Sequence, residues 1–433
     1  MRALQVNGDT FKAEIPVPVT LEDITSMNLL RIRRFSQSDE TFENWQLYAE
    51  QECNVGFDRY TQFPFLLTVW VDEKTEQARL MLFSDHYMSD GRSGMVVLNC
   101  ILEQVSSLNT ENRDVSVQEF PLHPSFYDMW LSKNFIFKEL LKGVIALFGE
   151  TIYRSEMNKF KPLLPARDDQ HDFVVPPVTN PTSASFMEGD AVCMQKTLRK
   201  CREENVTFGG ALIAAITLAF YHAARKLPGI EPGQPFKVAV DVDYNMRQRV
   251  PSPAEEDQVG AYITFADLGW LASEGVDVET TRFWDFARRA KNEIDGNLRN
   301  SVTVAAMTVV MDQKLNANTK PSLAKSVRIR HSQTSDANIS NVGRYPYAKE
   351  HPLGEKKPLV VKNLYVYNPI PHLGPSAVFF VTSVESFCYS MGHKCENEAA
   401  NYLFTAWIAI CEHIGSIGAD TKLVDVLRHV NLA

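Results

Sequence analysis

A histidine, an aspartate and a glycine occur in one short segment at a spacing that suits acid–base chemistry. The pattern is His86-x-x-x-Asp90-Gly91. Histidine suits a general base because its unperturbed pKa lies near neutrality. Asp90 offers an anionic partner, either for the imidazole N–H or for an arginine that fixes the loop, and Gly91 lets the chain turn. The pattern predicts a catalytic His86, and the alternative is a surface turn with solvated polar residues.

The neighbouring sequence places this pattern at a corner between a strand and a helix. Apolar residues over Phe63 to Val71 and over Ala78 to Ser84, separated by a polar turn, predict a hairpin. After Gly91 the apolar residues recur at helical spacing. They are Met95, Leu98, Leu102 and Val105. Such corners favour catalytic side chains because a rigid scaffold holds an exposed loop.

Two arginines follow a predicted strand over Phe236 to Tyr244. Arg247 and Arg249 stand two residues apart at its end. Either could pair with Asp90 or bind the phosphates of a cofactor, because guanidinium groups bind both anions in a bidentate manner. The alternative is a polar strand end without a functional role.

Small polar residues in two later segments could bind substrate. The stretch from Ser340 to Arg344, which includes Asn341, is predicted as a loop that could donate hydrogen bonds to an oxyanion. Turn chemistry explains it equally well. Thr382 and Ser383, near the end of another predicted strand, are similar candidates.

Other chemistries fit the sequence less well. Ser93 lies one position short of the G-x-S-x-G elbow of serine hydrolases, so we interpret it as an ordinary residue of the first helical turn. Walker A, G-x-G-x-x-G and H-E-x-x-H patterns are missing, and His86 with Asp90 supplies too few ligands for zinc. We therefore expect no metal and no tightly bound cofactor.

Composition indicates an α/β protein larger than one core. The 433 residues are 45% hydrophobic, and elements with strand and helix periods succeed one another. Proline and polar residues between Pro162 and Pro181 predict an extended linker. We predict an N-terminal lobe over 1–165, a linker over 166–190 and a C-terminal lobe over 191–433.

Charge, cysteines and hydropathy suggest the setting of the protein. The net charge of −9 argues against nucleic acid as a partner. Seven scattered cysteines suit reduced thiols. The start of the chain lacks the apolar core of a signal peptide, and the apolar stretch from Phe208 to Phe220 is short for a transmembrane segment. We expect a cytoplasmic monomer.

In order and spacing these features resemble the chloramphenicol acetyltransferase-like superfamily. It includes nonribosomal peptide condensation domains, wax ester synthases and plant-type BAHD acyltransferases. The likeness spans nearly the whole chain and is strongest to free-standing, condensation-like alcohol acyltransferases. It rests on His86-x-x-x-Asp90-Gly91, the small-residue helix from Val206 to Phe220, Asn245 to Arg249, Val259-Gly260, and Ser340 to Gly343.

The resemblance implies a fold and a division of roles. It implies an α/β (α+β) fold of two similar lobes, each with a mixed or antiparallel sheet and flanking helices, and an active-site tunnel at their interface. His86 would be the general base, Asp90 an anchor of the loop, and Asn341 and the Arg247 region would face the tunnel. Many members carry two adjacent histidines; His86 matches the second of them, and this chain has Asp85 in place of the first.

The implied reaction moves an acyl group from acyl-CoA to a hydroxyl of a secondary metabolite or lipid. His86 would take the proton from the acceptor, which could also be an amine, and would return it to the departing thiolate. One alternative is a condensation-type enzyme that uses the thioester of an acyl carrier protein and forms an ester or amide. Another is a non-catalytic binding module with the same fold.

Overall fold

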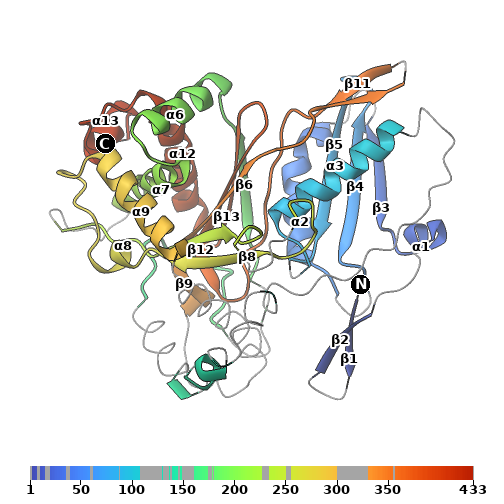
Figure 1. Cartoon of the computed structure of the whole chain (residues 1–433), viewed down its shortest axis with the longest axis horizontal. Coiled ribbons are helices and arrows are strands. Elements are labelled where there is room, and N and C mark those ends of the chain that lie inside the picture. The colour runs from blue at the N-terminus through green and yellow to red at the C-terminus, as the bar shows by residue number, and fades with distance from the viewer. Residues whose placement is uncertain are drawn as a thin grey trace. The chain divides into compact units, whose positions relative to one another are not determined.

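The computed structural model of the chain contains two compact units (Figure 1). It describes residues 2–6, 10–14, 20–35, 40–58, 62–86, 88–107, 129, 136, 139–144, 147–148, 160–173, 178, 180–226, 234–249, 255–299, 330–354 and 356–432. The first unit consists of Met1–Phe126, Arg247–Tyr262 and Pro346–Val361. The second unit consists of Tyr127–Met246, Ile263–Tyr345 and Lys362–Ala433.

The two units differ from the lobe boundaries that the sequence suggests. Arg247–Tyr262 and Pro346–Val361, from the C-terminal half, belong to the first unit. The predicted linker over 166–190 contains strand β6, Ser183–Glu188, which pairs with a strand of the second unit. The predicted linker is therefore not an unpacked connection throughout, because its last part completes the edge of a sheet.

The first unit contains a three-stranded sheet in the order β3-β4-β5. The elements of the whole unit are β1 (Arg2–Val6), β2 (Thr10–Glu14), α1 (Leu21–Ser26), β3 (Leu30–Phe35), the 3-10 helix η1 (Glu40–Asn44), α2 (Trp45–Val55), β4 (Phe65–Asp72), β5 (Gln77–Ser84), α3 (Gly91–Ser107), β10 (Glu350–Leu353) and β11 (Lys356–Val360). Strand β4 is parallel to β3 and antiparallel to β5. The β4–β5 pairing confirms the predicted hairpin.

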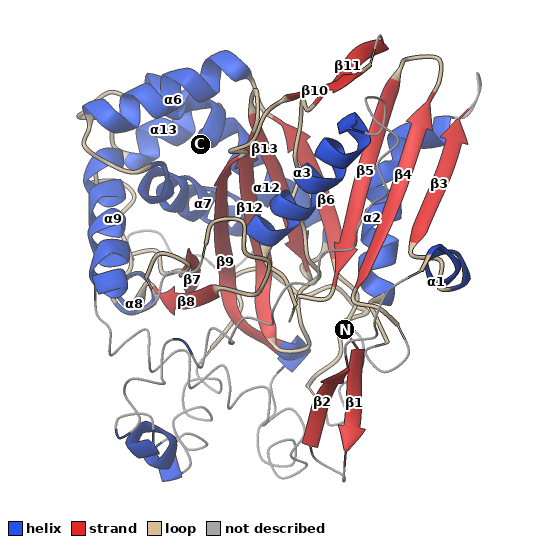
Figure 2. Cartoon of the chain, turned by 45° about the vertical axis from the view of Figure 1, so that its right-hand side comes forward, coloured by secondary structure: helices blue, strands red, loops and turns tan. Residues whose placement is uncertain are grey.

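Helices α2 and α3 lie on opposite faces of this sheet (Figure 2). On the α2 face, the ring of Tyr48 lies 5.0 Å from that of Trp70, and its hydroxyl is 3.1 Å from Thr68 Oγ1. Thr68 and Trp70 point to the same face because alternate residues of a strand do so, and both are buried there. The sheet therefore holds the end of β5 and the start of α3 on a packed scaffold.

The second unit is built on a six-stranded mixed sheet in the order β6-β13-β12-β9-β7-β8. Its further elements are α6 (Ala191–Glu203), α7 (Phe208–Arg225), β7 (Val240–Asn245), β8 (Ile263–Asp267), α8 (Gly269–Ser273), α9 (Phe283–Arg299), η3 (Arg330–Ser332), β9 (Gln333–Arg344), β12 (Gly374–Ser383), β13 (Phe387–His393), α12 (Asn397–His413), η4 (Ile414–Ser416) and α13 (Leu423–His429). Strand β9 is parallel to both β12 and β7, and the other pairs are antiparallel.

Helix α7 is the central core helix of the second unit. Thr207 caps it by accepting the backbone N–H of Gly210 at 3.3 Å. A Cβ on Gly210 would lie 2.4 Å from the Ala287 carbonyl oxygen of α9, so only glycine allows this close packing. With 18 residues and a mean hydropathy of 1.2, α7 is long and apolar enough to cross a membrane. However, 78% of it is buried inside the protein.

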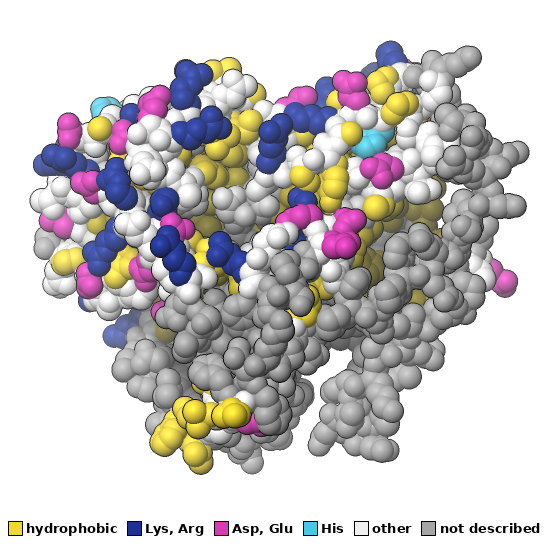
Figure 3. Space-filling view, in the orientation of Figure 1, with side chains coloured by type: hydrophobic (Ala, Val, Ile, Leu, Met, Phe, Trp, Pro, Cys, Tyr) yellow, Lys and Arg dark blue, Asp and Glu magenta, His cyan; other side chains and the backbone are white. Residues whose placement is uncertain are grey.

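Cationic and anionic side chains lie beside one another on the face shown in Figure 3. On helix α9, Arg288 pairs with Asp285 at 2.9 Å, and Arg289 pairs with Glu274 at 2.6 Å. Exposed pairs of this kind contribute about 0–1 kcal/mol each. They neutralise much of the local charge on this helix.

Candidate active site

His86 lies in the loop between β5 and α3, and its side chain is exposed. Its Nδ1 atom is 2.8 Å from the backbone carbonyl oxygen of Ser89. A carbonyl oxygen can only accept a hydrogen bond, so Nδ1 carries the proton and donates it. In the neutral ring this leaves the lone pair on Nε2, which is the state that a general base requires.

The carbonyl that orients His86 belongs to the peptide group between Ser89 and Asp90. Both of these residues are buried, at 3% and 5% exposure. The Ser89 hydroxyl lies 2.6 Å from the Ser84 hydroxyl at the end of β5. The acceptor of the imidazole is thus attached to the strand through Ser89 and to the helix through Asp90.

Asp90 forms a bidentate ion pair with Arg247. The Nη1–Oδ2 distance is 2.8 Å and the Nη2–Oδ1 distance is 2.9 Å. The two side chains are 2% and 0% exposed. Of the two roles that the sequence left open for Asp90, the structure therefore shows the pairing with an arginine. Arg249 is exposed, and the burial of Arg247 leaves no surface for a cofactor phosphate.

The Asp90 carboxylate also receives two backbone hydrogen bonds. Oδ1 accepts the N–H of Ser93 at 2.8 Å, which caps helix α3, and Oδ2 accepts the N–H of Tyr262 at 3.0 Å. Burial raises the pKa of Asp90, but the hydrogen bonds and charge of Arg247, together with these N–H groups, outweigh it. The net pKa lies below the ordinary value. Asp90 therefore stays ionised and anchors the loop.

Ser93 is a central residue of this network that the sequence reading missed. Its side chain is fully buried, and its hydroxyl oxygen accepts from Arg247 Nη2 and from the Gly260 N–H, both at 2.9 Å. The single hydroxyl proton can go to the Gly260 carbonyl at 2.8 Å or to Asp90 at 3.0 Å. The sequence predicts an ordinary first-turn residue at Ser93, whereas in the structure it joins α3 to the segment around Gly260.

One signal in the sequence could have directed attention to that segment. Strands β7 and β8 pair as an antiparallel hairpin, yet residues 246–262 connect them, and hairpin loops usually have two to five residues. Long connections of this kind are often functional. In the described part of this one, the Gln258 carbonyl accepts from Arg247 at 3.1 Å, and the Arg247 guanidinium lies 4.9 Å from the centre of the Tyr262 ring.

Gly260 is required by the tight packing of this segment, so Gly260→Ala should destabilise the first unit. A Cβ on Gly260 would lie 2.5 Å from the Tyr262 ring, which is buried and hydrogen-bonded to Gln258. We expect a loss of about 1–3 kcal/mol in the free energy of unfolding, measured by urea denaturation. Gly94→Ala is the matched control: nothing lies within 4 Å of its Cβ position in α3, so stability should rise by up to about 1 kcal/mol. Equal effects of the two substitutions would contradict this packing argument.

Asp85 stands directly before His86, and its backbone closes the turn over residues 85–88 that carries this histidine. Its backbone N–H donates to the Pro64 carbonyl and its carbonyl accepts the Met88 N–H, both at 2.9 Å. These two bonds define the path of the chain on either side of His86. A role of the Asp85 side chain in binding stays a prediction.

The other predicted site residues lie in the second unit, on the neighbouring strands β9 and β12. Ser340 and Asn341 are in β9 and not in the predicted loop, because parallel pairing with β12 satisfies their backbone. Asn341 pairs with Val381, and after a register shift Gly343, with φ +92°, pairs with Thr382.

The side chains at these strand ends differ in solvent exposure. Asn341 is exposed, which suits a ligand-binding amide. Thr382 and Ser383 are buried, at 1% and 9% exposure, and the Thr382 hydroxyl donates its proton to the Leu364 carbonyl. Binding roles for Ser340, Asn341 and Ser383 stay predictions, while Thr382 already has a structural partner.

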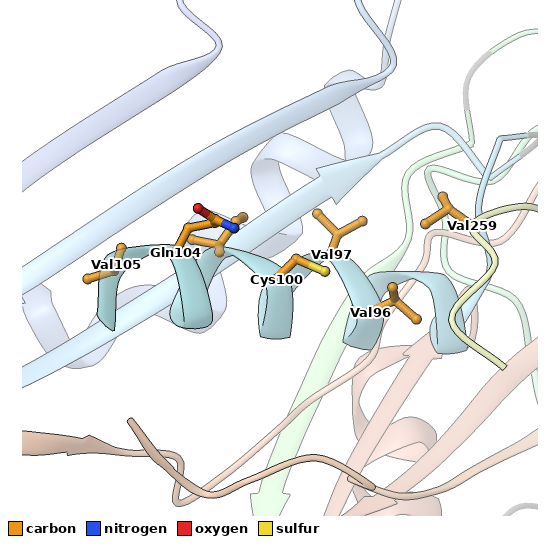
Figure 4. Close-up of a pocket in the computed structure, with 7 residues that line it drawn as sticks. Val96, Val97, Cys100, Gln104, Val105 and Val259 are labelled. Atoms are coloured by element: carbon orange, nitrogen blue, oxygen red, sulfur yellow. The ribbon is translucent and has the colours of Figure 1, made fainter. Parts of the chain in front are cut away.

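An apolar groove of about 370 Å³ follows the outward side of helix α3 (Figure 4). It is lined by Val96, Val97, Cys100, Ile101, Gln104, Val105 and Val259. Val259 stands between Gln258 and Gly260, whose carbonyls both accept from Arg247. The groove is therefore continuous with the segment that anchors the His86 loop. Among the described residues, no group of three or more His, Cys, Asp or Glu side chains could hold a metal ion.

Comparisons with known proteins identify the family and the fold. Residues 24–391 match the family model described as alcohol acetyltransferase. No curated protein matches the sequence. The trichothecene 15-O-acetyltransferase TRI3 from Fusarium sporotrichioides is similar in structure, with a TM-score of 0.64 and 11% identity, over 96% of this chain and 83% of that chain.

Two further solved structures are similar. The first condensation domain of the calcium-dependent antibiotic synthetase has a TM-score of 0.57 and 11% identity, over 98% of this chain and 85% of that chain. SgcC5 from Streptomyces globisporus has a TM-score of 0.55 and 12% identity, over 97% of this chain and 86% of that chain. At these identities the likeness concerns the fold, and it confirms the predicted mixed α/β architecture.

Proposed function

We propose that this chain, which belongs to the alcohol acetyltransferase family, uses His86 as the general base of acetyl transfer. The family carries out acyl-CoA-dependent O-acetylation of alcohols, so the enzyme class and the alcohol acceptor follow from membership. The observation that carries the role of His86 is its hydrogen bond to the Ser89 carbonyl, which leaves Nε2 free to accept a proton.

The proposed reaction is a direct transfer. Nε2 of His86 takes the hydroxyl proton while the alcohol oxygen attacks the thioester carbonyl carbon. The C–O bond forms, the C–S bond breaks, and the imidazolium returns the proton to the thiolate, which leaves as CoA. Throughout, Nδ1 donates to the Ser89 carbonyl. Asp90 does not exchange protons with the ring, because Arg247 and two backbone N–H groups occupy its carboxylate.

The α3 groove supports an acceptor with an alkyl chain. An acetyl group has only two carbons and needs no extended apolar surface, so a groove beside the site would serve the alcohol. From Val96 to Val105 the helix rises about 14 Å, at about 1.5 Å per residue. We therefore propose linear or lightly branched alcohols, of a lipid-like kind, as the substrate class.

A series of primary alcohols with acetyl-CoA tests this function through release of free thiol. We expect kcat/KM to rise by up to about fourfold per added methylene until the groove is filled, since each buried methylene contributes about 0.8 kcal/mol. Cys100→Trp should flatten the rise for the longer alcohols and leave the shortest unchanged, because Cys100 is exposed in the groove. Val55→Trp, at an 83% exposed position of α2, is the matched control.

The outcomes separate the alternatives. Absence of thiol release with every alcohol would favour a non-catalytic module, and release only from an acetylated carrier protein would favour a condensation-type enzyme. A chain-length dependence that Cys100→Trp leaves unchanged would exclude the groove and keep the acetyltransferase.

We further propose that the enzyme works as a monomer in the cytoplasm, without a tightly bound cofactor. All seven cysteines are free thiols, and four of them are buried in the second unit, which suits a reducing compartment. We expect only some of these thiols to react with a thiol reagent under native conditions, because four are buried. Reductants should not change the activity.

A further inference from the structure

We propose that the hydroxyl pair formed by Ser84 and Ser89 is a positioning device for His86. In this proposal, which rests on the role of His86 given above, the pair fixes the backbone carbonyl that selects the catalytic tautomer of the imidazole. Neither serine touches the reacting atoms, so both act through the histidine.

The pair connects the loop to a rigid strand. The two hydroxyl oxygens are 2.6 Å apart, and Ser89 is 3% exposed. Ser84 is the last residue of β5 and lies opposite Phe65 of β4 in the sheet register. Its backbone is therefore held by the sheet, and the hydrogen bond transmits that fixed position to Ser89.

The Ser89 carbonyl is held from two sides, and only one of them depends on the serine pair. Its peptide group continues into Asp90, which Arg247 and the first turn of α3 hold by several hydrogen bonds. The direction of the carbonyl also depends on the backbone torsion of Ser89 itself. Without the hydroxyl pair, Ser89 can rotate while the buried ion pair stays intact.

In this arrangement the hydroxyl pair governs the orientation of the His86 ring, whereas the buried ion pair stabilises the loop. If the carbonyl turns away, the His86 ring loses the acceptor that keeps the proton on Nδ1, and both tautomers become accessible. Only one of them offers a lone pair on Nε2 to the alcohol. Removal of the pair should therefore lower the rate of the chemical step, and the binding of substrates should change little.

Alanine substitutions of the two serines test the proposal. Ser84→Ala and Ser89→Ala should each lower kcat by about 10-fold, a fraction of the total that acid–base catalysis contributes, with KM for acetyl-CoA and alcohol unchanged. The double variant should be no worse than either single one, because all three lack the same hydrogen bond. Ser84→Thr keeps the hydroxyl at a strand position that tolerates β-branching and should restore kcat.

Ser106→Ala is the matched control. Its hydroxyl donates to the Pro352 carbonyl at 2.6 Å, so the substitution removes an equally short hydrogen bond from the same unit, at the far end of α3. We expect wild-type kcat from this variant. An equal loss in the control, or additive losses in the double variant, would mean that the serines stabilise the fold without positioning His86.

Nitrogen-15 NMR of histidine-labelled protein provides a readout that does not need turnover. At a pH where the ring is neutral, the His86 signals, assigned by their loss in His86→Ala, should show a protonated Nδ1 and an unprotonated Nε2 in the wild type. Ser84→Ala should shift them toward a mixture of tautomers. Unchanged signals in this variant would overturn the positioning role, even if the wild type proved to have no acetyltransferase activity.

Discussion

His86→Ala should lower kcat by about 10²- to 10⁴-fold, which is the range that a positioned acid–base group contributes. The variant loses the atom that accepts the proton of the alcohol and returns it to the thiolate. Because the His86 side chain is exposed, with its Nδ1 hydrogen bond to Ser89 inside its own loop, we expect the midpoint of thermal unfolding to stay close to that of the wild type. Thiol release from acetyl-CoA, with a saturating alcohol, measures the effect.

Two comparisons make this result specific to His86. His171→Ala changes another exposed histidine, in the second unit, and should keep wild-type kcat. His86→Asn keeps a polar side chain but not a base of suitable pKa, so it should resemble the alanine variant. If His86→Ala retained more than a tenth of the wild-type kcat, the general base would have to be another residue.

Arg247→Met should lower the free energy of unfolding by about 3–5 kcal/mol, the usual cost of removing one partner from a buried ion pair. The substitution leaves the Asp90 carboxylate buried without its cation, and it removes a donor from Ser93 and from the Gly260 carbonyl. Urea denaturation at neutral pH measures the loss. Arg249→Met, two residues away at an exposed position, should stay within about 0.5 kcal/mol of the wild type.

The difference between the wild type and Arg247→Met should depend on pH in a defined direction. In the wild type the pKa of Asp90 is lowered, so its contribution to stability is full above the unfolded pKa and is lost as pH falls through the folded pKa. In the variant, burial without the cation raises the pKa of Asp90. The cost of burying this unpaired carboxylate therefore lowers the stability at neutral pH and disappears when Asp90 is protonated. The stability gap should therefore narrow between pH 7 and pH 4. A constant gap would mean that Asp90 is not the source of the loss.

The same variant connects stability with catalysis. Asp90 and Ser89 share the peptide group whose carbonyl accepts from His86. A displaced Asp90 should therefore lower kcat even at temperatures where Arg247→Met remains folded. This loss differs from that of Ser84→Ala, which should occur without a comparable change in the free energy of unfolding.

Much of the site was determined by local sequence. The spacing of His86, Asp90 and Gly91 places a base and an anchor within five residues of each other, and the change from strand period to helix period places them at a corner. Side-chain chemistry and periodicity act over a few residues, so both features can be read without a structure. The family resemblance was carried by the same local motifs.

Only the tertiary structure decided the partners of these residues. Arg247 and Arg249 have the same chemistry, and the choice between them depends on which side chain the turn after β7 directs toward Asp90, far away in the sequence. The role of Ser93 depends on Gly260 in the same way. Contacts between such distant segments leave no local periodic signal.

The segment from Ser340 to Arg344 shows that distant partners also determine secondary structure. Its small polar residues predict a loop, but β9 continues through it because β12 supplies the parallel hydrogen bonds along its length. A strand is stabilised by its neighbour as much as by its own residues, since backbone pairing with the adjacent strand satisfies its N–H and C=O groups. The sequence therefore determined which residues could do the chemistry, and the packing of distant segments determined which of them are held in place to do it.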